Sequence, residues 1–147
     1  MILIREFSPT DIASVREVVK YSLGESYPPS LYLTIHNLWP SGFLVAREDG
    51  KVVAFLAAIV SGPRAARVLM LAVLPQHRRR SFGRLLMREF YSRCITKGLD
   101  SVTLEVRKSN RNAIAFYGRE GFSRVGELNN FYSNGEDAYQ FMKTLQT

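Results

Sequence analysis

Residues 71–84 read LAVLPQHRRRSFGR, and this stretch decides the fold. The apolar run before Leu74-Pro75 is typical of a strand that ends there, and the residues from about Gly83 onward have the apolar spacing of a helix. Between them lies a short loop rich in arginine. Backbone N–H groups at a helix start have no partner inside the helix, and the helix dipole favours negative charge there. The stretch therefore predicts a strand, a turn that binds an anion, and a helix.

Positive charge is concentrated at this strand-to-helix turn in four arginines: Arg78, Arg79, Arg80 and Arg84. Guanidinium groups add long-range attraction and bidentate contacts to a phosphate. The alternative is a solvated basic turn without a ligand. The glycines that a P-loop or a Rossmann motif requires are absent, so a phosphate site here would be of another kind.

Turn and cap residues divide the rest of the chain into alternating elements. Ser8-Pro9 begins a helix that ends before Gly24, and Asp49-Gly50 joins two strands in a hairpin. Strands are expected at 2–7, 43–48, 51–60, 67–73, 101–106, 123–127 and 137–145, and helices at 9–23, 30–38, 83–97 and, after a cap at Ser109, to Glu120. This order predicts the α/β (α+β) class: a single mixed, twisted sheet of about seven strands flanked by about four helices, in one domain over residues 1–147.

The composition indicates a globular protein of the cytoplasm. Apolar residues make up 46% of the 147 residues and charged residues 22%, so a packed core is expected and disorder is not. The single cysteine, Cys94, rules out an internal disulfide, and neither it nor the two histidines has metal-ligand spacing, so no metal is expected. The longest apolar run, residues 52–60, is too short for a bilayer, and no secretory signal begins the chain, so no membrane partner is expected.

The formal net charge of +7 favours anionic partners without naming one. A nucleic-acid-binding module is one interpretation. However, the chain has neither a recognition helix with clustered base-reading residues nor a strand motif with interleaved aromatic residues. No specific nucleic acid is therefore expected, and a phosphate-rich cofactor fits the clustered arginines better.

Four segments, taken in order, resemble the GNAT superfamily of acetyltransferases. In the pattern Gln/Arg-x-x-Gly-x-Gly/Ala, Arg78 matches the first position and Gly83 the last, while Ser81 stands where the first glycine is expected. The resemblance continues through 104–110 (LEVRKSN), 113–117 with 121–122 (AIAFY, GF) and 130–132 with 135–139 (NFY, GEDAY). Together they are similar to the RimI-type and the archaeal or eukaryotic catalytic N-terminal acetyltransferases, over about residues 2–145.

The resemblance implies the GNAT fold and acetyl-CoA as the acetyl donor. Its acetyl and pantetheine portion would lie against the backbone of Leu71, Ala72 and Val73, with Asn110 on the pantetheine arm and Tyr117 beside the sulfur. The remaining cofactor-binding residues implied are those of the basic turn: Arg78, Arg79, Arg80, Ser81, Phe82, Gly83 and Arg84. Serine at position 81 costs about 1 kcal/mol if the backbone there needs positive φ, and could add a hydroxyl donor if φ is negative. The sequence leaves both open.

Acetyl transfer from a thioester to an amine requires an amine without its extra proton, donors for the oxyanion, and a proton for the departing thiolate. An α-amino group has a pKa near ~8 and needs little help from a base. The resemblance implies Glu105 as the base and Tyr117 as the acid; the alternatives are an exposed or ion-paired strand glutamate and a half-buried helix tyrosine. Cys94 falls in an apolar row with Leu86 and Phe90, so we expect an inert thiol and direct transfer.

The acceptor is expected to be a protein N-terminus, of a ribosomal or nascent polypeptide. Glu25 and Tyr27 match the substrate loop of N-terminal acetyltransferases, and Tyr132 and Tyr139 match aromatic positions in the loop between the last two strands. Ordinary loop tyrosines around a proline turn are the alternative for these residues. A GNAT enzyme that acetylates small-molecule amines or lysine side chains is the alternative function. Ribosome association is left open, and the expected state is a monomer or weak homodimer.

Overall fold

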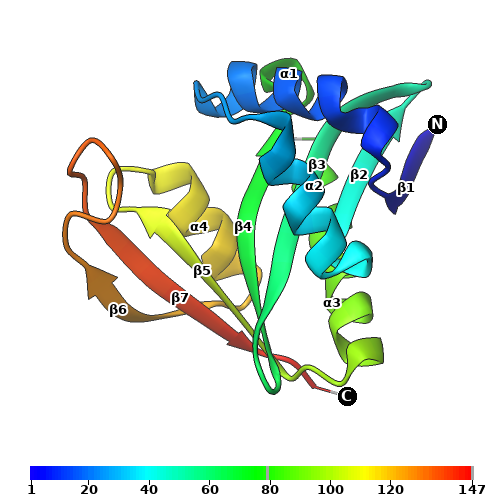
Figure 1. Cartoon of the computed structure of the whole chain (residues 1–147). Helices are drawn as coiled ribbons and strands as arrows, with labels where there is room; N and C mark the ends of the chain where they lie inside the picture. The colour runs from blue at the N-terminus through cyan, green and yellow to red at the C-terminus, as the bar shows by residue number, and fades with distance from the viewer. Residues whose placement is uncertain (79, 147) are drawn as a thin grey trace.

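The computed structural model describes residues 1–78 and 80–146, and its seven strands form one mixed sheet in the order β1-β2-β3-β4-β5-β7-β6 (Figure 1). The strands are β1 (Ile2–Glu6), β2 (Phe43–Glu48), β3 (Lys51–Gly62), β4 (Ala65–Val73), β5 (Ser101–Arg107), β6 (Ser123–Leu128) and β7 (Ala138–Thr144). The helices are α1 (Ile12–Leu23), α2 (Pro29–Leu38), α3 (Phe82–Lys97) and α4 (Arg111–Arg119), with short 3-10 turns η1 (Pro9–Asp11), η2 (Pro40–Gly42) and η3 (Pro75–His77). The predicted element order and the mixed seven-stranded sheet are confirmed.

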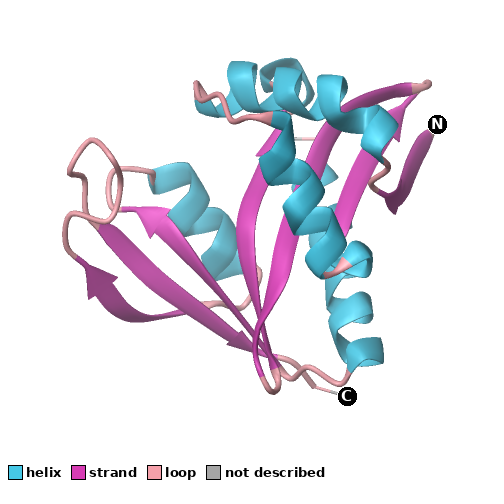
Figure 2. Ribbon diagram, in the orientation of Figure 1, coloured by secondary structure: helices cyan, strands magenta, loops and turns pink. Residues whose placement is uncertain are grey.

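Helices cover both faces of the first half of the sheet. This explains why buried and exposed residues alternate so little along its strands. In Figures 1 and 2, α1 and α2 lie in front of β2–β4, and α3 lies behind them. Residues 52–58 of β3 are buried without interruption, as expected for a strand covered on both sides. The largest side chains of this core come from strands and helices alike, among them Tyr32, Phe43, Phe55 and Phe90.

The sheet parts between β4 and β5, its one parallel neighbour pair among the described strands. Their pairing covers only three residue pairs, from Ala65–Ser101 to Arg67–Thr103, although β4 continues to Val73 and β5 to Arg107. Figures 1 and 2 show the β1–β4 half and the β5–β7 half diverging from this point like the arms of a V. The facing backbone edges of both strands are therefore left without a strand partner.

A β-bulge in β4 lies at the start of the parting. Ala57 of β3 pairs with Met70 and Ala58 pairs with Val68, so Leu69 is an extra residue on β4. A bulge bends its strand and increases the local twist. Leu69 therefore helps to turn the end of β4 away from β5.

Turn residues place the element ends as the sequence predicts, with one exception. Asp49 and Gly50 both have positive φ, at 51° and 85°, as a tight two-residue hairpin requires. The expected cap of α4 at Ser109 is wrong: Asn110 caps this helix, and its Oδ1 accepts a hydrogen bond from the N–H of Ala113 at 3.1 Å. The Ser109 hydroxyl donates to Glu136 instead, so a long-range partner takes it out of the capping role. Among the described residues, no helix combines the length and apolar character needed to cross a membrane.

Gly42 allows the connection between α2 and β2 to lie directly against the Trp39 ring. A Cβ at this position would be 2.2 Å from Cε3 of Trp39, a side chain that is buried against Phe90. We expect Gly42→Ala to lower the free energy of unfolding by about 1–3 kcal/mol, because the ring must shift in a packed core. Gly118→Ala is the matched control, since a Cβ there has open space on α4, and it should be neutral or stabilising. Thermal melting of both variants checks this, and equal melting temperatures would contradict it.

Candidate active site

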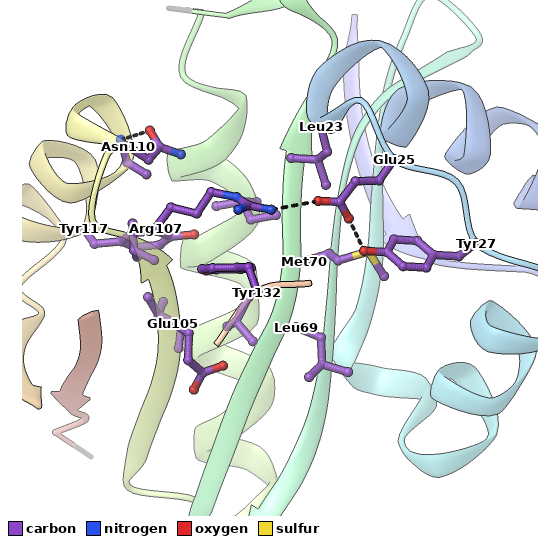
Figure 3. A pocket seen from close by; sticks show the side chains of 15 residues that line it. Leu23, Glu25, Tyr27, Leu69, Met70, Glu105, Arg107, Asn110, Tyr117 and Tyr132 are labelled. Atoms are coloured by element: carbon purple, nitrogen blue, oxygen red, sulfur yellow. Dashed lines mark hydrogen bonds and ion pairs between the residues drawn. The ribbon is translucent and has the colours of Figure 1, made fainter. Parts of the chain in front are cut away.

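A pocket opens where β4 and β5 part, and residues from five segments line it (Figure 3). Its walls are residues 68–71 of β4 and 104–107 of β5. The remaining lining residues come from the end of α1 and the loop after it, the start and middle of α4, and the loop between β6 and β7: Leu23, Glu25, Tyr27, Asn110, Ala113, Tyr117 and Tyr132. Residues that the sequence assigns separately to base, acid, cofactor contact and acceptor contact therefore share one cavity.

Glu105 lies in the pocket wall and is held by Arg67 on the opposite strand. The Arg67 guanidinium donates two hydrogen bonds to Oε1 of Glu105, from Nε at 3.0 Å and from Nη2 at 2.8 Å. The Glu105 side chain is 9% exposed. Glu105 is therefore ion-paired, as the alternative interpretation of the sequence expects. The same residue also borders the cavity, so its role as the base remains a prediction. Sequence reasoning missed Arg67, whose only signal is a charged residue between the buried Ala66 and Val68.

Tyr117 contributes a hydroxyl to the pocket from the middle of α4. Its ring is buried and meets Phe116 and Phe122 edge to face, with centroids 5.1 and 5.5 Å apart. The hydroxyl has no hydrogen-bond partner within the described part of the chain. Burial raises the pKa of the Tyr117 phenol, with Tyr132 and Glu120 nearby acting in the same direction. The phenol therefore keeps its proton at neutral pH.

Two loops form the mouth of the pocket, and they carry Glu25, Tyr27 and Tyr132 of the predicted acceptor residues. Glu25 and Tyr27 come from the loop between α1 and α2, and the Tyr27 hydroxyl donates to the Glu25 carboxylate. Burial and this carboxylate raise the pKa of Tyr27 to about 12. Tyr132 comes from the loop between β6 and β7 and lines both this pocket and an adjoining outer one.

Tyr139 does not line either pocket. It pairs with Val106 across the sheet, whereas Glu105 pairs with Gln140. Directly paired residues point to the same face of a sheet and successive residues to opposite faces, so Tyr139 lies on the face away from Glu105. Its ring is covered by cations instead, with Arg124 4.6 Å and Lys108 5.3 Å from the centroid. The predicted acceptor contact of Tyr139 therefore gains no support from the geometry.

The predicted anion-binding turn ends at Ser81, which caps α3 in the left-handed region. Its φ is 67° and its ψ 14°, so position 81 needs positive φ, and the first of the two possibilities for serine applies. The Ser81 side chain makes no capping hydrogen bond. The first hydrogen bond of the helix runs from the N–H of Leu85 to the carbonyl oxygen of Ser81, at 3.0 Å. The N–H groups of 82–84 thus have no partner inside the helix and fit a phosphate.

Gly83, the last residue of the resemblance pattern, has a packing role. A Cβ at this position would lie 3.2 Å from Cζ of Phe116, so glycine lets α3 come close to α4. The first turn of α3 is thereby in close contact with α4, the helix that carries Tyr117. Leu71 lines the pocket, while Ala72 is buried and Val73 half-buried at the end of β4, where the strand pairs with β3 but not with β5.

Among the arginines of the turn that the structure describes, Arg78 and Arg80 are bound to protein groups. Arg80 forms a two-pronged ion pair with Glu48 at the end of β2, at 2.7 and 2.6 Å. Arg78 donates to the carbonyl and the hydroxyl of Ser22 near the end of α1, both at 3.2 Å. Arg84 belongs to the first turn of α3. Arg79 lies outside the described residues. Arg78 and Arg80 therefore anchor the turn to its neighbours, and the backbone of the helix start remains the group best placed for a phosphate.

Over residues 12–122 the chain matches the Acetyltransferase (GNAT) family. It therefore belongs to this family, and it is an acyltransferase whose acetyl donor is acetyl-CoA. Cys94 is fully buried in α3 and does not line the pocket.

The relatives of this chain cover nearly all of it. An N-alpha-acetyltransferase of Sulfurisphaera tokodaii is 31% identical, with 92% of this chain and 89% of that protein aligned. The crystal structure of Ard1 from Thermoplasma volcanium has 39% identity and a TM-score of 0.96, with 99% of each chain covered. Naa20 of Chaetomium thermophilum, solved in complex with a bisubstrate analogue, has 26% identity and a TM-score of 0.88 over 97% of this chain and 86% of that one.

Replacement of Ser81 tests the strain at the cofactor turn. Ser81→Gly should raise the free energy of unfolding by about 1 kcal/mol, because glycine adopts positive φ freely, and it should leave coenzyme A affinity unchanged or improved. Ser81→Ala is the control that keeps the strained backbone and removes only the hydroxyl. Thermal melting and calorimetric titration with coenzyme A measure both effects. A loss of affinity in both variants would show that the hydroxyl itself binds a phosphate.

Proposed function

We propose that this protein transfers the acetyl group of acetyl-CoA to the N-terminal α-amino group of a polypeptide, by direct attack in a ternary complex. The observation that carries this proposal is the mouth of the pocket, where Glu25, Tyr27 and Tyr132 from two loops stand over the cavity that holds Glu105 and Tyr117. The similarity to proteins named N-alpha-acetyltransferase and to Ard1, along almost the whole chain, supports the same acceptor.

The outer pocket has the chemistry of a peptide site. Aromatic rings and short polar side chains line it, with Glu25 and Arg107 as its charged groups: Glu25, Ser26, Tyr27, Arg107, Phe131, Tyr132, Ser133 and Asn134. Hydroxyl and amide groups can bond a peptide backbone, and the rings shield these bonds from water. The Glu25 carboxylate suits an ammonium group. The proposed acceptors are ribosomal or nascent polypeptides in the cytoplasm, because these present a free α-amino group at the end of an extended chain.

The proton transfers fall to two residues of the pocket. We assign Glu105 as the base that takes a proton from the acceptor amine, directly or through a water, with Arg67 fixing the position of its carboxylate. Tyr117 is assigned as the acid that gives the departing thiolate its proton. N–H groups on the unpaired edge of β4 are the proposed donors to the developing oxyanion. Acetyl-CoA supplies an activated thioester, so the chain itself needs no covalent intermediate.

A covalent route through Cys94 is disfavoured by its environment. The thiol is fully buried in the apolar core, and desolvation raises its pKa to about 12. A thiol of this kind does not form the thiolate that nucleophilic attack requires. Direct attack of the amine is therefore the route that the site supports.

An assay of coenzyme A release separates this function from its alternatives. The purified protein with acetyl-CoA should turn over peptides that have a free N-terminus. Peptides with a blocked N-terminus and an internal lysine should react poorly, as should small amines. Mass spectrometry of the product locates the acetyl group. Turnover of small amines or internal lysines in preference to free N-termini would overturn the proposal.

The acid and the base are distinguishable by their pH–rate profiles. Tyr117→Phe keeps the ring and removes the proton, so kcat should fall by about 10²–10⁴-fold at every pH, with little change in coenzyme A binding. Glu105→Gln should also lower kcat, but higher pH should partly restore it, because the amine then loses its proton unaided. Tyr91→Phe is the packing control, since this half-buried tyrosine donates its hydroxyl hydrogen bond to Glu120 and lines neither pocket. Near-full turnover by Tyr117→Phe, with chemistry rate-limiting, would make Tyr117 a packing residue only.

A further inference from the structure

Arg107, the last residue of β5, joins the two loops at the mouth of the pocket, a role that no local sequence pattern indicates. Its Nη2 lies 3.5 Å from Oε1 of Glu25 in the loop between α1 and α2. Its Nη1 lies 3.0 Å from Oε2 of Glu136 and 3.4 Å from Oδ1 of Asn134 in the loop between β6 and β7. Figure 3 shows the side chain reaching across the pocket to Glu25.

The Arg107 guanidinium also lies against an aromatic ring of the mouth. Its Cζ is 3.9 Å from the centroid of Tyr132, close enough for a favourable cation–π contact. The side chain is 30% exposed and lines both pockets. Along the described chain, no other hydrogen bond or ion pair connects residues 24–28 with residues 129–137. One cation at the end of β5 therefore connects both loops.

The charges around Arg107 leave the mouth with one uncompensated negative charge. Glu25 and Glu136 are two carboxylates facing one guanidinium, and the Ser109 hydroxyl, together with Arg107, lowers the pKa of Glu136 and keeps it ionised. Lys108, the next residue, is bound to Glu127 and Asp137 and does not share these partners. An acceptor ammonium, with one positive charge, complements this arrangement. A second positive charge on the first side chain of the acceptor would meet Arg107.

We propose that Arg107 determines the charge of the acceptors that the enzyme accepts: it positions both loops around the peptide and disfavours acceptors whose first side chain is cationic. This inference rests on the proposed function, because it assumes a peptide N-terminus as the acceptor. The physical basis is the cost of placing like charges together in a partly buried site, which suppresses wrong partners more than it strengthens right ones.

The test compares peptides that differ only in the first residue, which is serine, glutamate or lysine. The wild-type enzyme should favour the serine peptide over the lysine peptide by about tenfold or more in kcat/KM. In Arg107→Met, KM for the serine peptide should rise about tenfold, because the loops lose their common anchor. The kcat/KM of the lysine peptide should rise relative to those of the other two peptides, because the negative charges of Glu25 and Glu136 then have no guanidinium to balance them. Coenzyme A affinity, measured by calorimetry, should stay within about twofold, since the guanidinium does not approach the helix start of α3.

Two further variants separate anchoring from charge and from folding. Arg107→Lys keeps the charge and loses the planar fork, so it should keep the discrimination against lysine while KM rises. Arg93→Met is the matched control: Arg93 is 26% exposed and held by Glu89 and Glu6, and it lines neither pocket. It should change neither KM nor the peptide preference. Hydrogen exchange of the free protein should show faster exchange in both loops for Arg107→Met than for Arg93→Met.

The outcomes distinguish this inference from the proposed function. If Arg107→Met folds, turns over peptides and keeps the wild-type serine-to-lysine ratio, the inference is overturned and the proposed function stands. If the wild-type enzyme binds coenzyme A but acetylates only small amines, both are overturned together. A shifted ratio in Arg107→Met with an unchanged ratio in Arg93→Met supports both.

Discussion

The parting of β4 and β5 after three residue pairs is the constraint on which the rest of the site depends. Parallel strands that stayed paired to Val73 and Arg107 would satisfy each other's backbone groups and leave no room for a substrate. Because they separate, the facing N–H and C=O groups need another partner, and the pocket forms between them. The Leu69 bulge supplies the bend, and Arg67, which belongs to the last residue pair, bridges the two strands through its ion pair with Glu105. The parting of β4 and β5 therefore accounts for both the divergence of the sheet and the position of the pocket.

Arginines bound to carboxylates hold the pieces of the site together. Arg80 ties the cofactor turn to Glu48, Arg67 ties β4 to Glu105, and Arg107 ties both mouth loops to β5. Each pair joins segments distant in sequence, and each uses a guanidinium, whose planar donors fix a carboxylate in one orientation. The excess of positive charge suggested attraction of an anionic ligand. The structure shows that several arginines near the site instead hold neighbouring protein groups in place before a substrate binds. Electrostatic catalysis requires such preorganised groups.

Local chemistry made the fold predictable, and long-range partners limited prediction of the site. Asp49-Gly50 and the glycines after α1 and α3 depend on their own backbone preferences, so the sequence places them well. Arg67 and Arg107 acquire their roles from Glu105 and Glu136, residues that no local pattern links to them. Tyr139 shows the same limit, because an aromatic residue in an alternating strand gives no sign of which face borders the pocket until the register with β5 is known.

The environments of Glu105 and Tyr117 suit a reaction that needs positioning more than strong acids or bases. An α-amino group with a pKa near ~8 is partly neutral in the cell, so a carboxylate held at a fixed place is a sufficient base. Burial keeps the Tyr117 phenol protonated, so a proton is present beside the pocket when the C–S bond breaks. The larger demand is to align the amine, the thioester and both side chains inside a cavity whose two walls belong to diverging strands. The Arg67 bridge fixes one wall, the contact of Gly83 with Phe116 holds the helix carrying Tyr117, and Arg107 fixes the mouth. The alignment of the reacting groups in this enzyme thus depends on noncovalent contacts that join the two halves of the sheet and the elements they carry.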